Sequence, residues 1–178
     1  MKAFTLVLLG CLLTLVPAGA RAELSVGSPA PTFSVAAALG GRDIAFDLTA
    51  ALTKGPVVVY FYPKSFTSVC TEEARLFAEA MDEFETLGAS VIGISTDTLE
   101  TQREFSRLGC RDKFPVGADP DGRIVRAYDA ARGARPTASR TSYVIAPSGQ
   151  IQAVLTASEA ESHVQFALKS IRESKRVR

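Results

Sequence analysis

Two kinds of hydrophobic pattern alternate along the middle of the chain. Continuous apolar runs, rich in β-branched and aromatic residues, occupy 56–62 ("PVVVYFY") and 89–95 ("ASVIGIS"). Such runs are typical of strands that are buried on both faces. Over 67–87 and 98–109, apolar residues instead recur at three- and four-residue steps between charged ones. This spacing predicts amphipathic helices, so the pattern indicates strands connected by helices.

The remaining segments extend this pattern in both directions. A closing helix is expected over 158–175, and the turn-rich region 23–56 precedes the first long strand. Shorter elements are predicted as strands near 33–35, 44–47 and 114–119, a helix at 122–129, a loop at 131–139, and a hairpin of 141–147 with 150–156. Parallel strands joined by helices, with an antiparallel hairpin at the end, predict a three-layer α/β/α sandwich around a central mixed β-sheet.

The first 22 residues have a different character. A positive start at Met1 and Lys2 is followed by an apolar run and by a small-x-small pattern at 20–22, with alanine at both ends. This order predicts a secretory signal peptide over 1–22, cut before Glu23, and one mature domain over 23–178. The alternative is a membrane anchor, but the run is short and is broken by Pro17. If the source is Gram-negative, the exported chain is expected in the periplasm.

Composition sets few further limits on function. The 178 residues are 47% hydrophobic and 22% charged, as in an ordinary globular domain. Loss of Lys2 and Arg21 with the signal lowers the 20 basic residues to 18 against 19 acids, a formal net charge of −1. This balance gives no reason to expect a nucleic acid partner or stable membrane association.

Two cysteines, Cys70 and Cys110, remain in the mature chain after the loss of Cys11. They lie 40 positions apart, which is neither a CxxC motif nor a zinc spacing, although thiols in an exported protein can pair. The single histidine, His163, lies among polar residues of the closing helix and is expected on a solvated face. Asp97 and Asp119 follow strands and are expected to serve turns.

Cys70 lies where the first long strand gives way to a helix. Unpaired backbone N–H groups and the helix dipole at that point favour thiolate over thiol. The Thr67 hydroxyl, one turn earlier, could cap the helix or bond to whatever meets the sulfur. Pro63 closes the loop and could shield the thiol from water. The position therefore predicts a nucleophile, with a small buried core residue as the alternative.

The spacing P-x-x-x-T-x-x-C over 63–70, after "VVVYFY" and before Thr71 and Glu73, resembles the active-site signature of the peroxiredoxins. The resemblance extends over about 25–175 and is strongest to the monomeric bacterioferritin-comigratory type. It implies a thioredoxin-like fold and a thiol peroxidase that reduces hydrogen peroxide and organic hydroperoxides without metal or haem. It also implies recycling by a thioredoxin-like dithiol protein, and a monomer or weak dimer.

The resemblance assigns roles to individual residues. Cys70 would be the peroxidatic cysteine, which becomes a sulfenic acid. Thr67 would hold the peroxide, Pro63 would limit access of water, and the N–H groups of Val69 and Cys70 would bind the developing oxyanion. Arg140, just before "TSYVIAP", would stabilise the thiolate and the leaving oxygen.

Two further assignments concern this arginine. Glu73 would orient Arg140. Arg135 is the second choice for the arginine that stabilises the thiolate and the leaving oxygen.

The chain departs from the family pattern at the second cysteine. Many relatives carry it five residues after the first, where this chain has Arg75, and others place it on the next helix, where Ser106 has no thiol. Cys110 follows that helix, so one hypothesis is an intramolecular disulfide that resolves the Cys70 sulfenic acid. Since disulfide Cα atoms lie within roughly 7 Å, the first helical turn would have to unwind. The alternative is an external resolving thiol.

Two other functions are compatible with the fold. An exported thioredoxin-like thiol–disulfide oxidoreductase normally needs CxxC, but position 73 is Glu rather than Cys. A non-catalytic thioredoxin-fold binding protein would not need Pro63, Thr67, Cys70 and Arg140 together.

Overall fold

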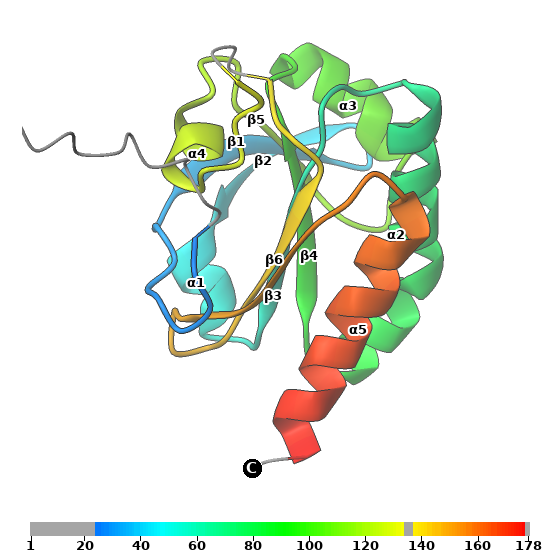
Figure 1. Cartoon of the computed structure of the whole chain (residues 1–178). Coiled ribbons are helices and arrows are strands. Elements are labelled where there is room, and N and C mark those ends of the chain that lie inside the picture. The colour runs from blue at the N-terminus through cyan, green and yellow to red at the C-terminus, as the bar shows by residue number, and fades with distance from the viewer. Residues whose placement is uncertain (1–23, 134–136, 177–178) are drawn as a thin grey trace, which may run out of the picture.

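A seven-stranded mixed sheet forms the centre of the molecule, in the order β2-β1-β5-β4-β3-β6-β7 (Figure 1). The structure is a computed structural model that describes residues 24–133 and 137–176. β3, β4 and β5 are parallel, whereas β6 pairs antiparallel with β3 and with β7. The signal peptide expected at 1–22, and Arg135, lie outside the described residues.

The elements follow the order expected from the sequence, with one addition. Asp47 accepts a hydrogen bond from the Ala50 N–H and begins a five-residue helix, α1, that the sequence pattern did not predict. In chain order the elements are β1 (Ser34–Leu39), β2 (Arg42–Asp47), α1 (Leu48–Leu52), β3 (Val57–Phe61), α2 (Ser68–Thr86), β4 (Ser90–Ser95), α3 (Leu99–Leu108), β5 (Val116–Ala118), α4 (Arg123–Ala127), β6 (Thr141–Ile145), β7 (Ile151–Thr156) and α5 (Ala160–Arg176).

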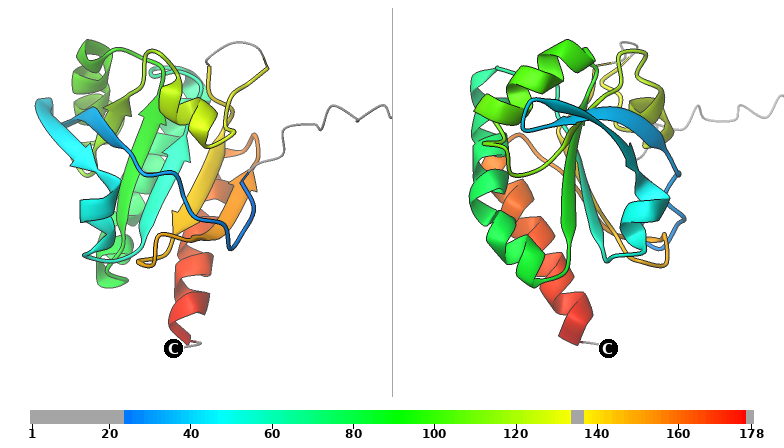
Figure 2. Two further views of the ribbon diagram at one scale, coloured as in Figure 1. Left: turned by 90° about the vertical axis from the view of Figure 1, so that its left-hand side faces the viewer. Right: turned by 180° about the vertical axis from the view of Figure 1, so that it is seen from behind.

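Two apolar cores lie on opposite faces of the sheet, which makes the fold a three-layer α/β/α sandwich. β3 is buried at every residue, and its alternate side chains serve the two cores because successive strand residues point to opposite faces. Val58 and Tyr60 face the core under α2 and α5. Val57 and Val59 face the core that α1 and α4 cover. Figure 2 shows α2 and α5 side by side on one face of the sheet.

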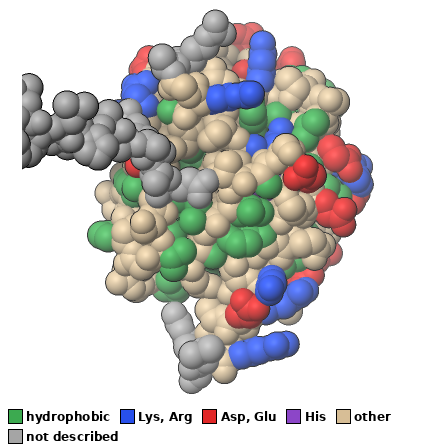
Figure 3. Space-filling view, viewed as in Figure 1, with side chains coloured by type: hydrophobic (Ala, Val, Ile, Leu, Met, Phe, Trp, Pro, Cys, Tyr) green, Lys and Arg blue, Asp and Glu red, His purple; other side chains and the backbone are tan. Residues whose placement is uncertain are grey.

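The face of the molecule seen in Figure 3 is mixed in charge. Figure 3 shows Lys and Arg side chains interspersed with Asp and Glu, and no histidine is visible on that face. Within 24–133 and 137–176, none of the helices combines the length and the apolar character needed to cross a membrane.

Candidate active site

Cys70 lies in the first turn of α2, directly after the strand-to-helix connection at 62–67. The residue is 2% exposed, so the sulfur lies beneath the surface. Thr67 is the N-cap residue with extended backbone, but its hydroxyl donates to the Lys64 carbonyl at 3.0 Å and makes no cap hydrogen bond to the helix. The first-turn N–H groups therefore lack a Thr67 cap and keep their positive potential near the sulfur.

Arg140 reaches the sulfur from the neighbouring strand. β6 pairs with β3 in a register that places Thr141 opposite Phe61, so residue 140 lies beside the end of β3 where the Cys70 connection begins. Nη2 of Arg140 donates to Sγ of Cys70 at 3.4 Å. Nη1 donates to Oε2 of Glu73, which lies one helical turn after Cys70 on the same face of α2. One guanidinium thus bridges a thiol and a carboxylate.

The Glu73–Arg140 pair is buried, which changes the pKa of both groups. Glu73 is fully buried and Arg140 is 10% exposed at its side chain. Burial raises the pKa of Glu73 to about 8, although the charge and hydrogen bond of Arg140 act in the opposite direction. Burial also lowers the pKa of Arg140, but Glu73 and Cys70 outweigh this effect and raise it above its usual value. Arg140 is therefore a fixed positive charge beside the sulfur.

The loop before Cys70 is attached to the end of β4 by a polar network. The Ser65 N–H donates to Oδ2 of Asp97 at 2.7 Å, and the Tyr62 hydroxyl donates to Oε1 of Gln102 at 2.8 Å. Asp97 therefore serves a turn, as expected, and also holds the loop that carries Thr67. Sequence reasoning missed Gln102, a fully buried polar residue on α3.

Pro63 and Asp119 lie where the sequence pattern placed them. Pro63 is half-buried in the connection before Cys70. Asp119 accepts from the Arg123 and Val125 N–H groups at 2.9 Å each and so begins α4. Its role is in a turn, and its own N–H donates to the Ser95 carbonyl at the end of β4.

The expectation of a solvated His163 is wrong. Its side chain is fully buried between α5 and the sheet. Nδ1 lies 2.8 Å from the Ser142 hydroxyl and Nε2 lies 3.2 Å from the Ala157 carbonyl. The reason is helical spacing, because His163 belongs to the apolar stripe of α5 with Ala160, Val164 and Ala167. That three- and four-residue spacing was the signal in the sequence.

Cys110 is a free thiol in the same apolar core as Cys70. It follows α3, its exposed fraction is zero, and its N–H donates to the Phe105 carbonyl at 3.0 Å. Burial, followed by the charge of Asp112, raises the pKa of the Cys110 thiol well above its usual value. In this conformation Cys110 is a neutral thiol rather than a thiolate.

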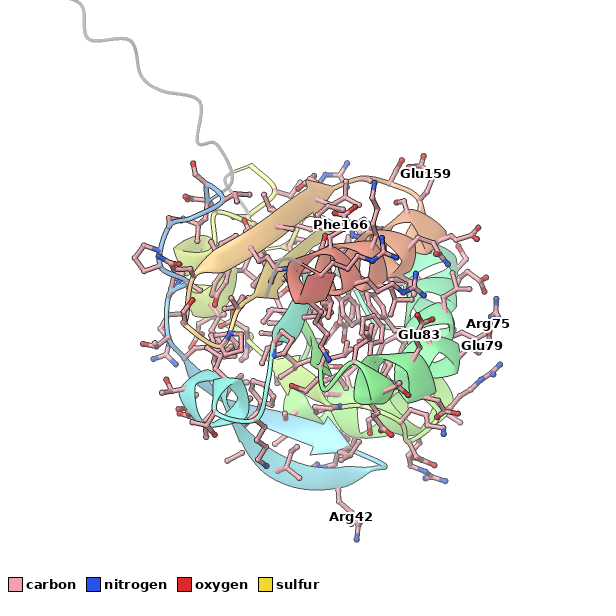
Figure 4. All side chains as sticks on the ribbon, turned by 90° about the horizontal axis from the view of Figure 1, so that it is seen from below. Arg42, Arg75, Glu79, Glu83, Glu159 and Phe166 are labelled. Carbon is pink, nitrogen blue, oxygen red and sulfur yellow. The ribbon has the colours of Figure 1, made fainter. Side chains whose placement is uncertain are left out.

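Arg75 and Ser106 occupy the two positions where relatives carry a second cysteine, and the side chains of both make contacts within the fold. Arg75 pairs with Glu72 and Glu79, and Figure 4 shows Arg75 and Glu79 projecting outward from the molecule. Ser106 is buried, where its hydroxyl accepts from the Gly41 N–H at 2.9 Å and donates to the Arg103 carbonyl. Ser106 thus ties α3 to the turn between β1 and β2.

These contacts define what the site can do chemically. A buried sulfur at a helix N-terminus, beside a guanidinium, is placed to act as a nucleophile toward an electrophilic oxygen or sulfur. The guanidinium can also stabilise a leaving anion. Across residues 24–133 and 137–176, no three His, Cys, Asp or Glu side chains are grouped so as to hold a metal ion.

Comparisons with known proteins bear on the family and the fold of the chain. Residues 26–154 match the AhpC/TSA family. A Bacillus subtilis protein named as a candidate peroxiredoxin, YkuU, is 34% identical over 140 residues, which cover 74% of this chain and 77% of that protein. The crystal structure of peroxidoxin BcpB from Mycobacterium tuberculosis superimposes with a TM-score of 0.78 at 28% identity, over 85% of this chain and 98% of that one.

A second solved structure gives the same result. The reduced 2-Cys peroxiredoxin of Plasmodium vivax has a TM-score of 0.77 at 26% identity, over 85% of this chain and 82% of that one. The fold is the thioredoxin-like α/β fold, as the sequence indicated. On the family match and the extent of these similarities, the chain belongs to the AhpC/TSA family, the peroxiredoxins.

Proposed function

We propose that the mature chain, 23–178, is an exported, periplasmic peroxidase that reduces hydrogen peroxide and organic hydroperoxides with Cys70. The observation that carries the proposal is the 3.4 Å hydrogen bond from Nη2 of Arg140 to Sγ of Cys70. It occurs at the start of a 19-residue helix, with Cys70 2% exposed. Two sources of positive potential therefore act on one shielded sulfur.

The first step is a displacement at oxygen. The Cys70 thiolate forms an S–O bond with the nearer peroxide oxygen, the O–O bond breaks, and the leaving oxygen takes a proton and departs as water or an alcohol. Cys70 is oxidised to the sulfenic acid and the peroxide is reduced. Arg140 stabilises the charge as it moves from sulfur to the leaving oxygen. Thr67, with its exposed hydroxyl one turn away, is placed to hold the peroxide.

The second step assigns Cys110 as the resolving thiol. Its thiolate would form an S–S bond with Cys70 and release the sulfenic oxygen as water. Because Cys110 is buried and the pKa of its thiol is raised, the segments that carry Cys70 and Cys110 must both open first. Left-handed backbone next to both cysteines favours this opening, because such a conformation costs free energy in residues other than glycine. It occurs at Phe66, before Cys70, and at Arg111 and Asp112, directly after Cys110.

Recycling requires an external dithiol. One thiolate of a thioredoxin-like protein attacks the Cys70–Cys110 disulfide, and its second thiol displaces the mixed disulfide, which restores two thiols and leaves the partner oxidised. Phe66 and Val69 flank Cys70 and are 46% and 44% exposed, an apolar surface that such a partner would contact. The similarity to BcpB over 98% of that chain supports assignment to the bacterioferritin-comigratory type. A monomer or weak dimer is part of the proposal and rests on the sequence resemblance alone.

The test is peroxide consumption by residues 23–178 with a thioredoxin system, beside Cys70→Ser and Cys110→Ser. Loss of turnover in both variants, with a Cys70–Cys110 linked peptide after one equivalent of peroxide, is the expected result. Loss in Cys70→Ser alone would replace internal resolution by an external thiol. Absence of turnover with thioredoxin and with small thiols would favour a non-catalytic binding protein.

The export step has its own measurement. The mass of the chain recovered from periplasmic extract should correspond to a start at Glu23. Recovery of the full-length chain in the membrane fraction would favour the anchor.

A further inference from the structure

The two carboxylate oxygens of Glu73 have different surroundings. Oε2 accepts from Arg140, whereas Oε1 is buried and has no hydrogen-bond partner among the described residues. A buried carboxylate oxygen without a donor is costly, so its surroundings need an explanation. Nδ1 of His163 lies 4.0 Å from this oxygen. A movement of about 1 Å would bring the two atoms into hydrogen-bond distance.

His163 is held so that both ring nitrogens face acceptors. Nε2 faces the Ala157 carbonyl at 3.2 Å, and since a carbonyl only accepts, Nε2 carries a hydrogen. Nδ1 faces the Ser142 hydroxyl at 2.8 Å and the free oxygen of Glu73. A proton on Nδ1 would therefore find acceptors already in place, although the ring is fully buried.

The charges around this histidine come from three packed elements. Burial lowers the pKa of His163, the hydrogen bond to the Ala157 carbonyl acts to raise it, and Arg140 before β6 acts to lower it. Glu159, before α5, acts to raise it. Glu73 and Cys70 of α2 complete the set. Burial of Glu73 raises the pKa of that carboxyl to about 8, so the two groups together retain a proton that His163 alone would lose near neutral pH.

A count of charges shows what this proton does. With Cys70 as a thiolate, the buried cluster holds two negative groups, Cys70 and Glu73, against one positive group, Arg140. An uncompensated charge in the interior is expensive. One proton on Oε1 of Glu73 or on Nδ1 of His163 brings the total to zero.

We propose that His163 is a positioning residue of the active site, which shares one proton with Glu73 between Nδ1 and Oε1 and so neutralises the cluster when Cys70 is a thiolate. The inference rests on the proposed role of Cys70 as the reacting thiol. Because coupling between two sites is reciprocal, the Cys70 thiolate must favour the shared proton as much as that proton favours the thiolate.

The first test uses the fact that the chain has a single histidine. In an untagged preparation every imidazole signal in a ¹H–¹⁵N NMR titration comes from His163. Replacing the thiolate by a neutral hydroxyl in Cys70→Ser should lower the pH midpoint of the imidazole titration relative to the reduced wild type. Equal midpoints in the two proteins would overturn the proposal.

The second test separates the two ring nitrogens. In His163→Asn the amide nitrogen replaces Nδ1, whereas in His163→Gln it reaches the position of Nε2. Alkylation of Cys70 by iodoacetamide at pH 7, followed on its peptide, should slow about tenfold in His163→Gln and less in His163→Asn, which corresponds to about 1.4 kcal/mol. Equal rates, or the reverse order, would assign His163 to the Ala157 carbonyl alone.

A matched control contacts the same helix from β7. Gln152 donates to the Ser170 carbonyl at 2.6 Å and so attaches α5 to β7 away from Glu73. Gln152→Leu should leave the alkylation rate at the wild-type value. If peroxide turnover is absent while the titration contrast persists, the proposed function fails and the coupling stands. Turnover with equal titration midpoints would support the proposed function and overturn the coupling.

Discussion

Ser65 and Asp97, 32 residues apart in sequence, are joined by a 2.7 Å hydrogen bond from the Ser65 N–H to Oδ2 of Asp97. Asp97 also accepts from the Ser95 hydroxyl at 2.8 Å, so its carboxylate is fixed at the end of β4. The bond connects the Cys70 loop to the sheet. Any opening of this loop, which the proposed resolving step requires, must break it.

Removal of the Asp97 carboxylate should loosen this loop. A hydrogen bond to a charged group contributes about 1.5–3 kcal/mol, so in Asp97→Ala the Ser65 amide should exchange with solvent at least tenfold faster. Hydrogen exchange followed by NMR measures this directly. Asp97→Asn keeps one carbonyl oxygen as an acceptor and should have a smaller effect. Unchanged exchange in Asp97→Ala would mean that other contacts hold the loop.

Arg140 should be required for its two-pronged geometry as well as for its charge. Nη1 and Nη2 contact Glu73 and Cys70 separately, which a lysine ammonium cannot reproduce. We expect Arg140→Met to lower kcat/KM for hydrogen peroxide by about 10²–10³, with Arg140→Lys in between. Stopped-flow kinetics of peroxide reduction provides the measurement.

The matched control for Arg140 is Arg103. It pairs with Asp43 on an exposed surface, so Arg103→Met should leave kcat/KM unchanged. A comparable loss in both variants would point to general destabilisation instead of a role at the sulfur.

The strand-to-helix junction at Cys70 could be predicted because two local signals coincide there. The apolar run at 56–62 is continuous, whereas the residues after Thr67 follow helical spacing, and the motif spacing fixes which residues share the first turn. The proximity of Arg140 to Cys70 could be predicted only from the family resemblance, because the register of β6 against β3 is a long-range property.

Other features depended on contacts that no local pattern encodes. The helix α1 has only five residues, too few for a periodic signal, and the Asp47 cap determines where it begins. The position of His163 on the apolar stripe of α5 was readable, but its approach to Glu73 depends on how α5 lies against α2 and β6. Because histidine was counted as a polar residue, His163 was not recognised as part of the apolar stripe of α5.

Glu73 should make the free energy of unfolding depend on pH. Its pKa is about 8 when folded, against a usual value of 4.5, so the folded chain holds a proton that the unfolded chain has lost between these limits. Stability must then fall as pH rises from about 4.5 to about 8, by at most about 1.4 kcal/mol per pH unit. In Glu73→Gln this decline should be weaker, as measured by urea unfolding across the same pH range.

Glu72 is the control for this measurement. It is the adjacent residue on α2, but it is exposed and paired with Arg75, and its pKa lies below its usual value because of that partner. Glu72→Gln should therefore keep the wild-type decline between pH 4.5 and 8. A Glu73→Gln profile that runs parallel to the wild type would show that Glu73 is ionised throughout this range.

Any side chain at Gly93 is expected to destabilise the fold because it would meet the ring of Tyr60. The two residues are opposite each other on β4 and β3, and a Cβ at Gly93 would lie 2.6 Å from Cζ of Tyr60. The ring has little room to move, since it stacks on Phe77 of α2 with centroids 4.4 Å apart. Overpacking of this kind costs about 1–3 kcal/mol, so Gly93→Ala should lower the free energy of unfolding by that amount.

A double-mutant cycle tests whether the ring of Tyr60 is the cause. The Tyr60 hydroxyl is buried, has no hydrogen-bond partner among the described residues, and would lie 2.7 Å from the new methyl group. Tyr60→Phe removes it and should recover part of the loss in the Gly93→Ala background, whereas Ser90→Ala on the same strand adds no atom and serves as the control. Strictly additive free energies would place the strain elsewhere in the core. Because Phe77 lies on the Cys70 helix, Gly93→Ala should also slow peroxide reduction, and the recovery in the double variant should appear in both measurements.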